Sequence, residues 1–107
     1  MTITKIRIVL VNTKSKKEAK KIAHTLVEER LAASANLLPK IQSIYRWQNK
    51  IQDKNEFMLV LKTTDTCIPP LIQRVQSLHS YKVPKIIVLP IQQGYKPYLD
   101  WIRENTL

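Results

Sequence analysis

The sequence is poor in the residues that build several common functional sites. Gly94 is the only glycine and Cys67 the only cysteine among 107 residues. A lone cysteine excludes an intrachain disulfide and a CxxC zinc or redox motif. Phosphate-binding loops of the usual kind need several glycines, so a nucleotide cradle of that kind has little support here.

Long apolar segments are also missing. No apolar run reaches the roughly 18 residues that a membrane-spanning helix needs, and residues 1–5 contain no apolar signal core. We therefore expect a cytoplasmic protein with no membrane partner.

Acidic residues are scarce, with 8 Asp and Glu against 18 Lys and Arg, and the net charge is +10. Such an excess can attract nucleic acid or small anionic ligands. Five lysines fall within residues 14–21, but most of them lie opposite the apolar stripe of a predicted helix, as expected for a solvated face. The chain has no basic tail and no RNA-binding aromatic strand pair, so we expect no nucleic acid partner.

The length allows one domain, 1–107, and the order of apolar patterns predicts its plan. Residues 3–11 form a short β-branched run typical of a central strand, and Ser15 with Glu18 forms a capping box ahead of a helix that extends to Leu31. Two long strands follow within residues 35–62, with their turn between residues 48 and 55. Residues 63–66 open a second helix, residues 86–89 form the last strand, and residues 98–105 form a short terminal helix.

This order predicts an α+β fold: a ferredoxin-like β-α-β-β-α-β sandwich with a long hairpin and a short C-terminal helix. A mixed sheet with another strand order fits less well. Two prolines further constrain the plan. Pro39 predicts a bulge, kink or edge position because it cannot donate to a sheet, and Pro69 is tolerable only in the first turn of its helix.

The long hairpin carries Tyr45, Trp47, Phe57 and Met58. An apolar sheet edge is an aggregation hazard unless it is paired or covered. Closed cyclic symmetry covers such an edge without open-ended growth. The hairpin therefore favours association with further copies of this chain, although each aromatic side chain could instead lie in the core of one subunit.

Six short motifs together resemble the CutA family of divalent-cation tolerance proteins over nearly the whole chain. They are VEERLAA at 27–33 with Asn36, SIYRW at 43–47, LKTT at 61–64, LHSYKVP at 78–84, VLP at 88–90 and YLDW at 98–101. The resemblance implies a ferredoxin-like subunit, a homotrimer and a role in tolerance of copper and other divalent cations, and it implies no enzyme. No catalytic triad is indicated by local motifs either.

The resemblance also identifies a candidate metal ligand. Some family members are proposed to bind copper through a first-strand cysteine and a histidine pair; here those positions hold Val11 and Leu78-His79. Only His79 remains, so we expect at most weak Cu(II) binding at His79, assisted by a neighbouring subunit or by Glu56. The alternative is that His79 only orders its turn. Of the other candidate ligands, His24 is expected at the surface and Cys67 in the packing.

A second candidate site is a pocket at a subunit interface. Trp47, Glu56, Lys62, His79 and Tyr81 belong to the family-like motifs and lie near predicted strand and helix ends, where polar groups can converge beside apolar walls. A structural ion pair between Lys62 and Glu56 is the alternative. The competing function is a trimeric signalling module like the PII proteins, which would bind a small anionic ligand between subunits.

Overall fold

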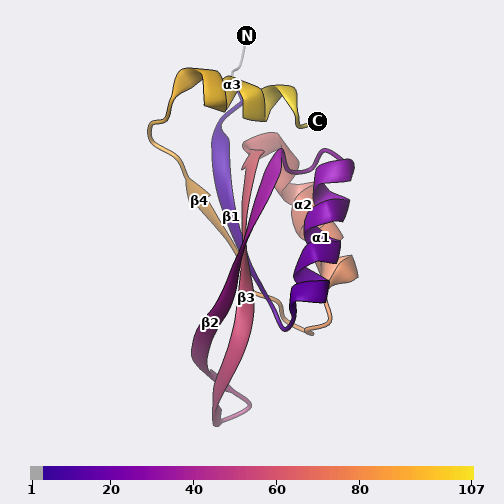
Figure 1. Ribbon diagram of the computed structural model, residues 1–107, viewed down its shortest axis with the longest axis vertical. Helices are drawn as coiled ribbons and strands as arrows, with labels where there is room; N and C mark the ends of the chain where they lie inside the picture. The colour runs from indigo at the N-terminus through magenta and orange to yellow at the C-terminus, as the bar shows by residue number, and fades with distance from the viewer. Residues whose placement is uncertain (1–3) are drawn as a thin grey trace.

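The computed structural model describes residues 4–107 and confirms the ferredoxin-like plan (Figure 1). Ile3, which was predicted to open the first strand, lies outside the described residues. In chain order the elements are β1 (Ile6–Thr13), α1 (Lys16–Glu28), β2 (Ser34–Trp47), β3 (Lys50–Thr64), a 3₁₀ turn (Asp65–Cys67), α2 (Ile68–Leu78), β4 (Ile86–Pro90) and α3 (Lys96–Glu104).

The four strands form one antiparallel sheet in the order β2-β3-β1-β4. The hairpin of β2 and β3 extends well beyond the helices, as Figure 1 shows. Its turn is Gln48-Asn49, and both residues have positive φ angles, as a two-residue type I′ connection requires. The predicted irregularity at Pro39 is confirmed as a register shift between Leu38 and Ile41.

One face of the sheet makes the core of the protein. Val9, Leu61 and Val88 stand side by side across three strands, and α1 and α2 pack against this face (Figure 1). The side chains that fill the space between the layers have no exposed surface; they include Ile22, Leu26, Leu59, Leu71 and Val75.

The start of α1 confirms half of the predicted capping box. The Ser15 hydroxyl accepts a hydrogen bond from the Glu18 backbone N–H at 3.2 Å. The Glu18 carboxylate does not return to Ser15; its Oε2 accepts from the Ser80 backbone N–H at 3.1 Å instead. The first turn of α1 therefore holds the loop that follows α2.

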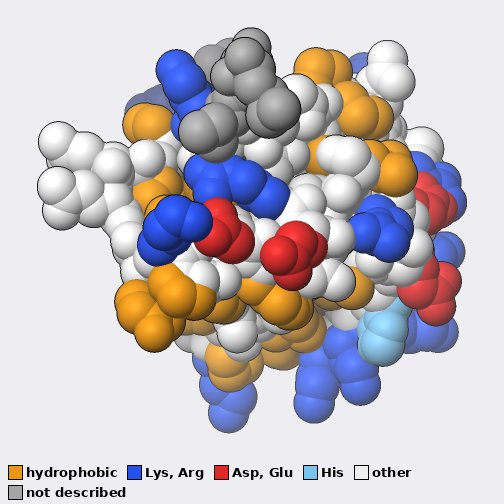
Figure 2. All heavy atoms as spheres, turned by 90° about the horizontal axis from the view of Figure 1, so that it is seen from above, with side chains coloured by type: hydrophobic (Ala, Val, Ile, Leu, Met, Phe, Trp, Pro, Cys, Tyr) orange, Lys and Arg blue, Asp and Glu red, His pale blue; other side chains and the backbone are white. Residues whose placement is uncertain are grey.

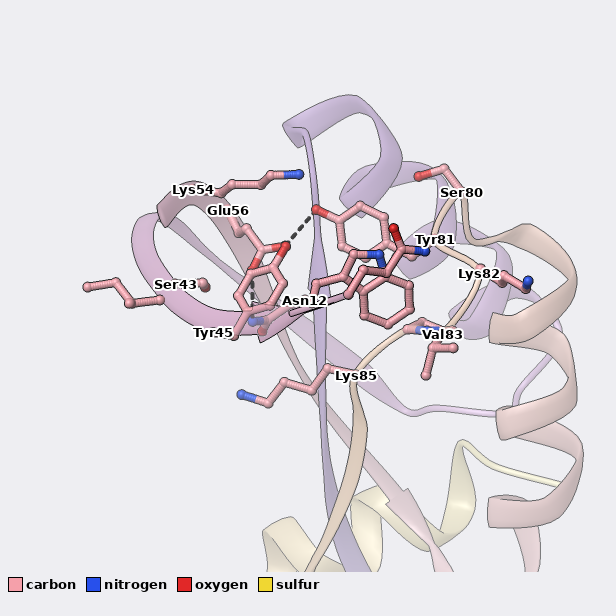
Figure 3. A pocket seen from close by; sticks show the side chains of 14 residues that line it. Asn12, Ser43, Tyr45, Lys54, Glu56, Ser80, Tyr81, Lys82, Val83 and Lys85 are labelled. Carbon is pink, nitrogen blue, oxygen red and sulfur yellow. Dashed lines mark hydrogen bonds between the residues drawn. The ribbon is translucent and has the colours of Figure 1, made fainter. Parts of the chain in front are cut away.

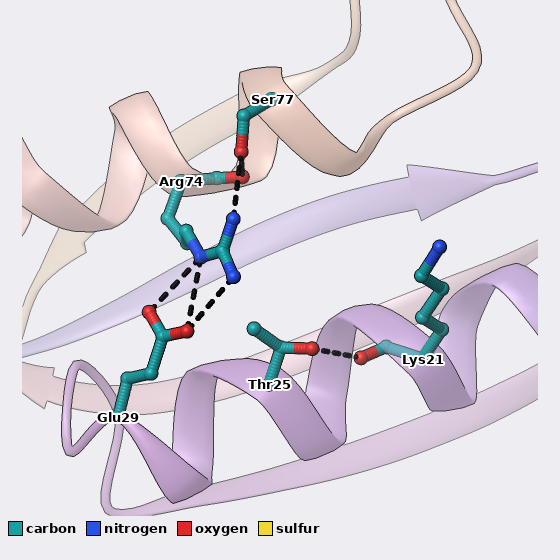
Figure 4. Close-up of polar contacts among 5 residues, drawn as sticks. All are labelled: Lys21, Thr25, Glu29, Arg74 and Ser77. Atoms are coloured by element: carbon teal, nitrogen blue, oxygen red, sulfur yellow. Dashed lines mark hydrogen bonds and ion pairs between the residues drawn. The ribbon is translucent and has the colours of Figure 1, made fainter.

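The predicted start of the second helix is wrong by several residues. Thr63 and Thr64 belong to β3, because both are buried and pair with Arg7 and Ile6. The helix proper begins at Ile68, and its prolines occupy the first turn as expected. At the C-terminal end of α1, Glu29 accepts three hydrogen bonds of 2.8 to 3.1 Å from the Arg74 guanidinium of α2 (Figure 4).

The opposite face of the sheet remains largely uncovered by the helices of the chain. Because side chains alternate along a strand, the neighbours of the core residues point away from α1 and α2. The helix α3 covers one end of this face, where Ile102 packs on Ile6. We call the remainder the open face; its apolar members are Ile8, Leu10, Leu38, Met58, Val60, Ile87 and Leu89.

Three side chains of the open face retain much of their surface in water: Leu38 is 42% exposed, Ile87 44% and Leu89 41%. Their exposure contrasts with the helix-covered face, where Leu59 and Leu61 are fully buried. An exposed apolar surface of this kind on a small domain is typical of an interaction site.

No helix among residues 4–107 is long and apolar enough to cross a membrane. Basic side chains lie around much of the end of the molecule that carries α3, interrupted by acidic and hydrophobic ones (Figure 2).

Candidate functional site

A cavity of about 820 Å³ opens between the outer half of the long hairpin, as far as its turn, and the loop that joins α2 to β4. Trp47 and Glu56 line it from the hairpin, and Tyr81 lines it from the loop. Figure 3 shows Glu56 and Tyr81 pointing toward each other. These three were predicted to share a pocket. Lys62 lies six residues beyond Glu56 on the same strand, about 20 Å away at strand spacing; its ammonium group donates to Asn36 and lies outside this cavity.

The floor of the cavity is a buried polar group of three side chains. Glu56 is only 3% exposed. Its Oε2 accepts a 2.6 Å hydrogen bond from the Tyr81 hydroxyl, and its Oε1 accepts one of 3.3 Å from the Asn12 amide nitrogen (Figure 3). The glutamate is buried because both of its oxygens have partners inside the fold.

His79 lies beneath the loop with no exposed side-chain surface. Its Nε2 is 2.6 Å from the Asn12 carbonyl oxygen, and its Nδ1 is 3.0 Å from the Tyr81 backbone nitrogen. A carbonyl can only accept and an N–H can only donate, so Nε2 carries the hydrogen and the lone pair of Nδ1 is already engaged. In this structure His79 orders the turn and has no free lone pair for a metal ion.

The other two candidate ligands are not near His79. His24 is exposed on α1, as predicted. Cys67 is buried, and its thiol faces the carbonyl oxygens of Leu107 at 3.6 Å and Arg30 at 4.0 Å. Residues 4–107 contain no group of three or more His, Cys, Asp or Glu side chains placed to hold a metal ion.

Tyr81 holds its proton more tightly than an ordinary tyrosine. Burial and the hydrogen bond to Glu56 together raise the pKa of Tyr81 well above its usual value of 10.0. The charged phenolate would be poorly solvated and would lie against a carboxylate. The folded chain therefore favours the neutral, hydrogen-bonding form.

We expect this raised pKa to make the stabilising effect of Tyr81 depend on alkaline pH. The folded state binds the proton more tightly than the unfolded state, so the contribution is complete below pH 10 and is lost as pH rises further. Tyr81→Phe should cost about 1.5 kcal/mol near pH 8, and less than that at about pH 11. Urea unfolding of both proteins across this range measures the difference; a difference that does not change with pH would contradict the expectation.

Sequence reasoning missed several residues of this cavity. Asn12, Lys54 and Lys85 line it together with the predicted residues. Asn12 and Glu56 are 44 positions apart in the chain, and the register that pairs β1 with β3 brings them together. The only local signal in the sequence was the position of Asn12, a polar residue directly after the apolar run of residues 3–11.

The fold and the cavity define the class of protein: a ferredoxin-like domain with a long hairpin, an open sheet face and a ligand-sized pocket along the outer half of the hairpin. The chain belongs to the CutA1 divalent ion tolerance protein family, whose pattern it matches over residues 7–105. Membership of this family of tolerance proteins agrees with the prediction that the chain is not an enzyme.

The relatives match in sequence and in structure. The chain is 50% identical over 99 residues to the divalent-cation tolerance protein CutA of Thermus thermophilus, covering 92% of this chain and 96% of that protein. It is 45% identical over 96 residues to Protein CutA of Homo sapiens, covering 90% of this chain but only 54% of that protein. The solved Thermus structure superposes with a TM-score of 0.92 at 48% identity, covering 94% of this chain and 98% of that one.

A second solved relative bears on location. The CutA of Archaeoglobus fulgidus, described as periplasmic, superposes with a TM-score of 0.91 at 36% identity and covers 94% of this chain and 97% of that chain. The periplasmic location is that of the Archaeoglobus protein and is not carried over to this chain. A cytoplasmic location for this chain stays a prediction.

Proposed function

We propose that this chain works as a homotrimer in the response to divalent cations, with its ligand-binding surface shared among neighbouring subunits. The open face carries the proposal. It presents apolar side chains from all four strands to water, and it lies beside the unpaired edges of β2 and β4. A neighbouring copy can cover this face and pair those edges, and a ring of copies closes without leaving an edge free.

The resemblance to the CutA family implies that three copies assemble and that the protein acts in cation tolerance. The names of the solved relatives support that role: the Thermus and Archaeoglobus proteins are both described as divalent cation tolerance proteins. The +10 net charge repels cations at long range. We infer that tolerance does not depend on concentrating free cations at the surface of one subunit.

The prediction of Cu(II) binding at His79 is tested by calorimetric titration. Because both ring nitrogens hold backbone groups, we expect no tight Cu(II) binding, and any weak binding should disappear in His79→Ala. His24→Ala removes an exposed imidazole and is the matched control. Copper binding that survives the His79 substitution would assign the metal to another site.

The cavity supports a second function, the binding of a small molecule with an anionic group. Lys54 and Lys85 reach it from opposite chain segments, and both side chains are exposed. Cationic groups beside aromatic walls are suited to an anionic ligand. This function resembles that of a PII-like signalling module, but without a glycine-rich phosphate loop.

A further inference from the structure

The floor of the cavity contains a buried oxygen without a hydrogen-bond donor. Asn12 is 7% exposed, and its amide nitrogen is committed to Glu56. Its other side-chain atom, Oδ1, is buried and accepts no hydrogen bond. A buried carbonyl oxygen left in this state carries a free-energy penalty, which a ligand that brings a donor would remove.

Glu56 adds acceptor capacity at the same point. A carboxylate can accept about four hydrogen bonds, and Glu56 accepts two in this structure, the one at Oε1 being long at 3.3 Å. The floor therefore offers unused acceptors beside a carboxylate. Such a surface favours an N–H donor with positive charge, because hydrogen bonds between charged partners are stronger than neutral ones.

The rim has the opposite character. Lys54 comes from β3 and Lys85 from the loop before β4, and in Figure 3 they extend on the two sides of the Tyr45 ring. Tyr45 and Trp47 also line the cavity and add aromatic wall beside these lysines. The cavity thus combines buried acceptors, exposed lysines and aromatic walls.

We propose that this cavity binds a small zwitterion, with its ammonium group at Asn12 and Glu56 and its carboxylate or other anionic group at Lys54 and Lys85. The proposal rests on the small-molecule function proposed above for the same cavity, and it specifies the ligand class. A simple anion would leave the Asn12 oxygen unpaired, and a bare divalent cation would be repelled by the two lysines. A molecule with both charges satisfies both ends.

The test is an NMR titration of the ¹⁵N-labelled full chain with zwitterions of different length and rigidity. The probes are 4-aminobutyrate, 6-aminohexanoate and 4-(aminomethyl)benzoate, and hexanoate and hexylamine are the single-charge controls. At least one zwitterion should shift the Asn12 side-chain amide resonance and bind about tenfold more tightly than either control. Equal binding of the single-charge compounds, or no shift with any zwitterion at about 10 mM, would overturn the proposal.

Two variants test where the charged groups of the zwitterion bind. Asn12→Leu removes the acceptor. The double change Lys54→Ala with Lys85→Ala removes the two exposed lysines that we expect to hold the anionic group, while Lys82, which also lines the cavity, remains. Each should weaken zwitterion binding about tenfold, while Lys21→Ala, an exposed lysine on α1, should leave it unchanged. Unchanged binding in the double lysine variant would overturn the proposal even if Asn12→Leu failed to fold.

Sedimentation of the same samples separates this proposal from the homotrimer. A trimer that shows no preference for zwitterions refutes only the ligand class. A monomer that does show the preference refutes only the trimer. Binding of the single-charge anion hexanoate as tightly as the zwitterions would support the broader small-anion function without the zwitterion.

Discussion

A Val60→Lys variant should sediment as a folded monomer under conditions in which the unmodified chain is a trimer. Val60 lies near the middle of the open face, paired with Leu10 on one side and Asn36 on the other. In one subunit a lysine at this position can extend its charge into water. In an assembly the same charge would be buried against a neighbouring copy without a partner, which costs several kcal/mol in each subunit.

The control for this prediction adds the same charge to the helix layer. Gln76 is exposed on α2, so Gln76→Lys should leave the sedimentation coefficient unchanged. Circular dichroism would show that both variants keep their fold. A Val60→Lys protein that remains a trimer would exclude the centre of the open face from the interface.

Leu61→Ala should lower the free energy of unfolding by about 3 kcal/mol. Leu61 is adjacent to Val60 in sequence but points to the other face of the sheet, where it is fully buried among residues of both helices and three strands. Removing its isobutyl group leaves a cavity that the surrounding layers cannot close. Guanidinium unfolding at one fixed protein concentration measures the change, since the stability of an assembly depends on concentration.

Val60→Ala is the matched control because it shortens the neighbouring side chain on the open face. Within an isolated subunit this change removes little buried surface, so it should alter the unfolding of the monomer by less than about 1 kcal/mol. If Leu61→Ala and Val60→Ala lowered the free energy of unfolding equally under conditions in which the chain is monomeric, the assignment of the two faces would be wrong.

Local chemistry was enough to predict most of the fold. The spacing of Ile22 and Leu26 identifies the buried face of α1, and the Ser15 hydroxyl caps that helix as its position indicates. Pro39 identifies the bulge because a missing N–H interrupts the ladder. These features depend on residues close together in the chain, whose effects on the backbone are direct.

The candidate site could be predicted only in part. Trp47, Glu56 and Tyr81 do share one cavity, but the polar group at its floor depends on the register of β1 against β3 and on the path of the loop after α2. Lys62 is excluded from the cavity for a simpler reason: it lies six residues from Glu56 on the same strand, so strand spacing alone separates the two. A sequence does not reveal register until the strand order and the bulge are known.

The most direct test of the account is the mass of the unmodified chain in solution. Sedimentation equilibrium at micromolar concentration should give about three times the 12.5 kDa of one chain, because the open face and the two sheet edges would then be covered by neighbouring copies. A stable monomer at that concentration, with the open face left in water, would contradict it.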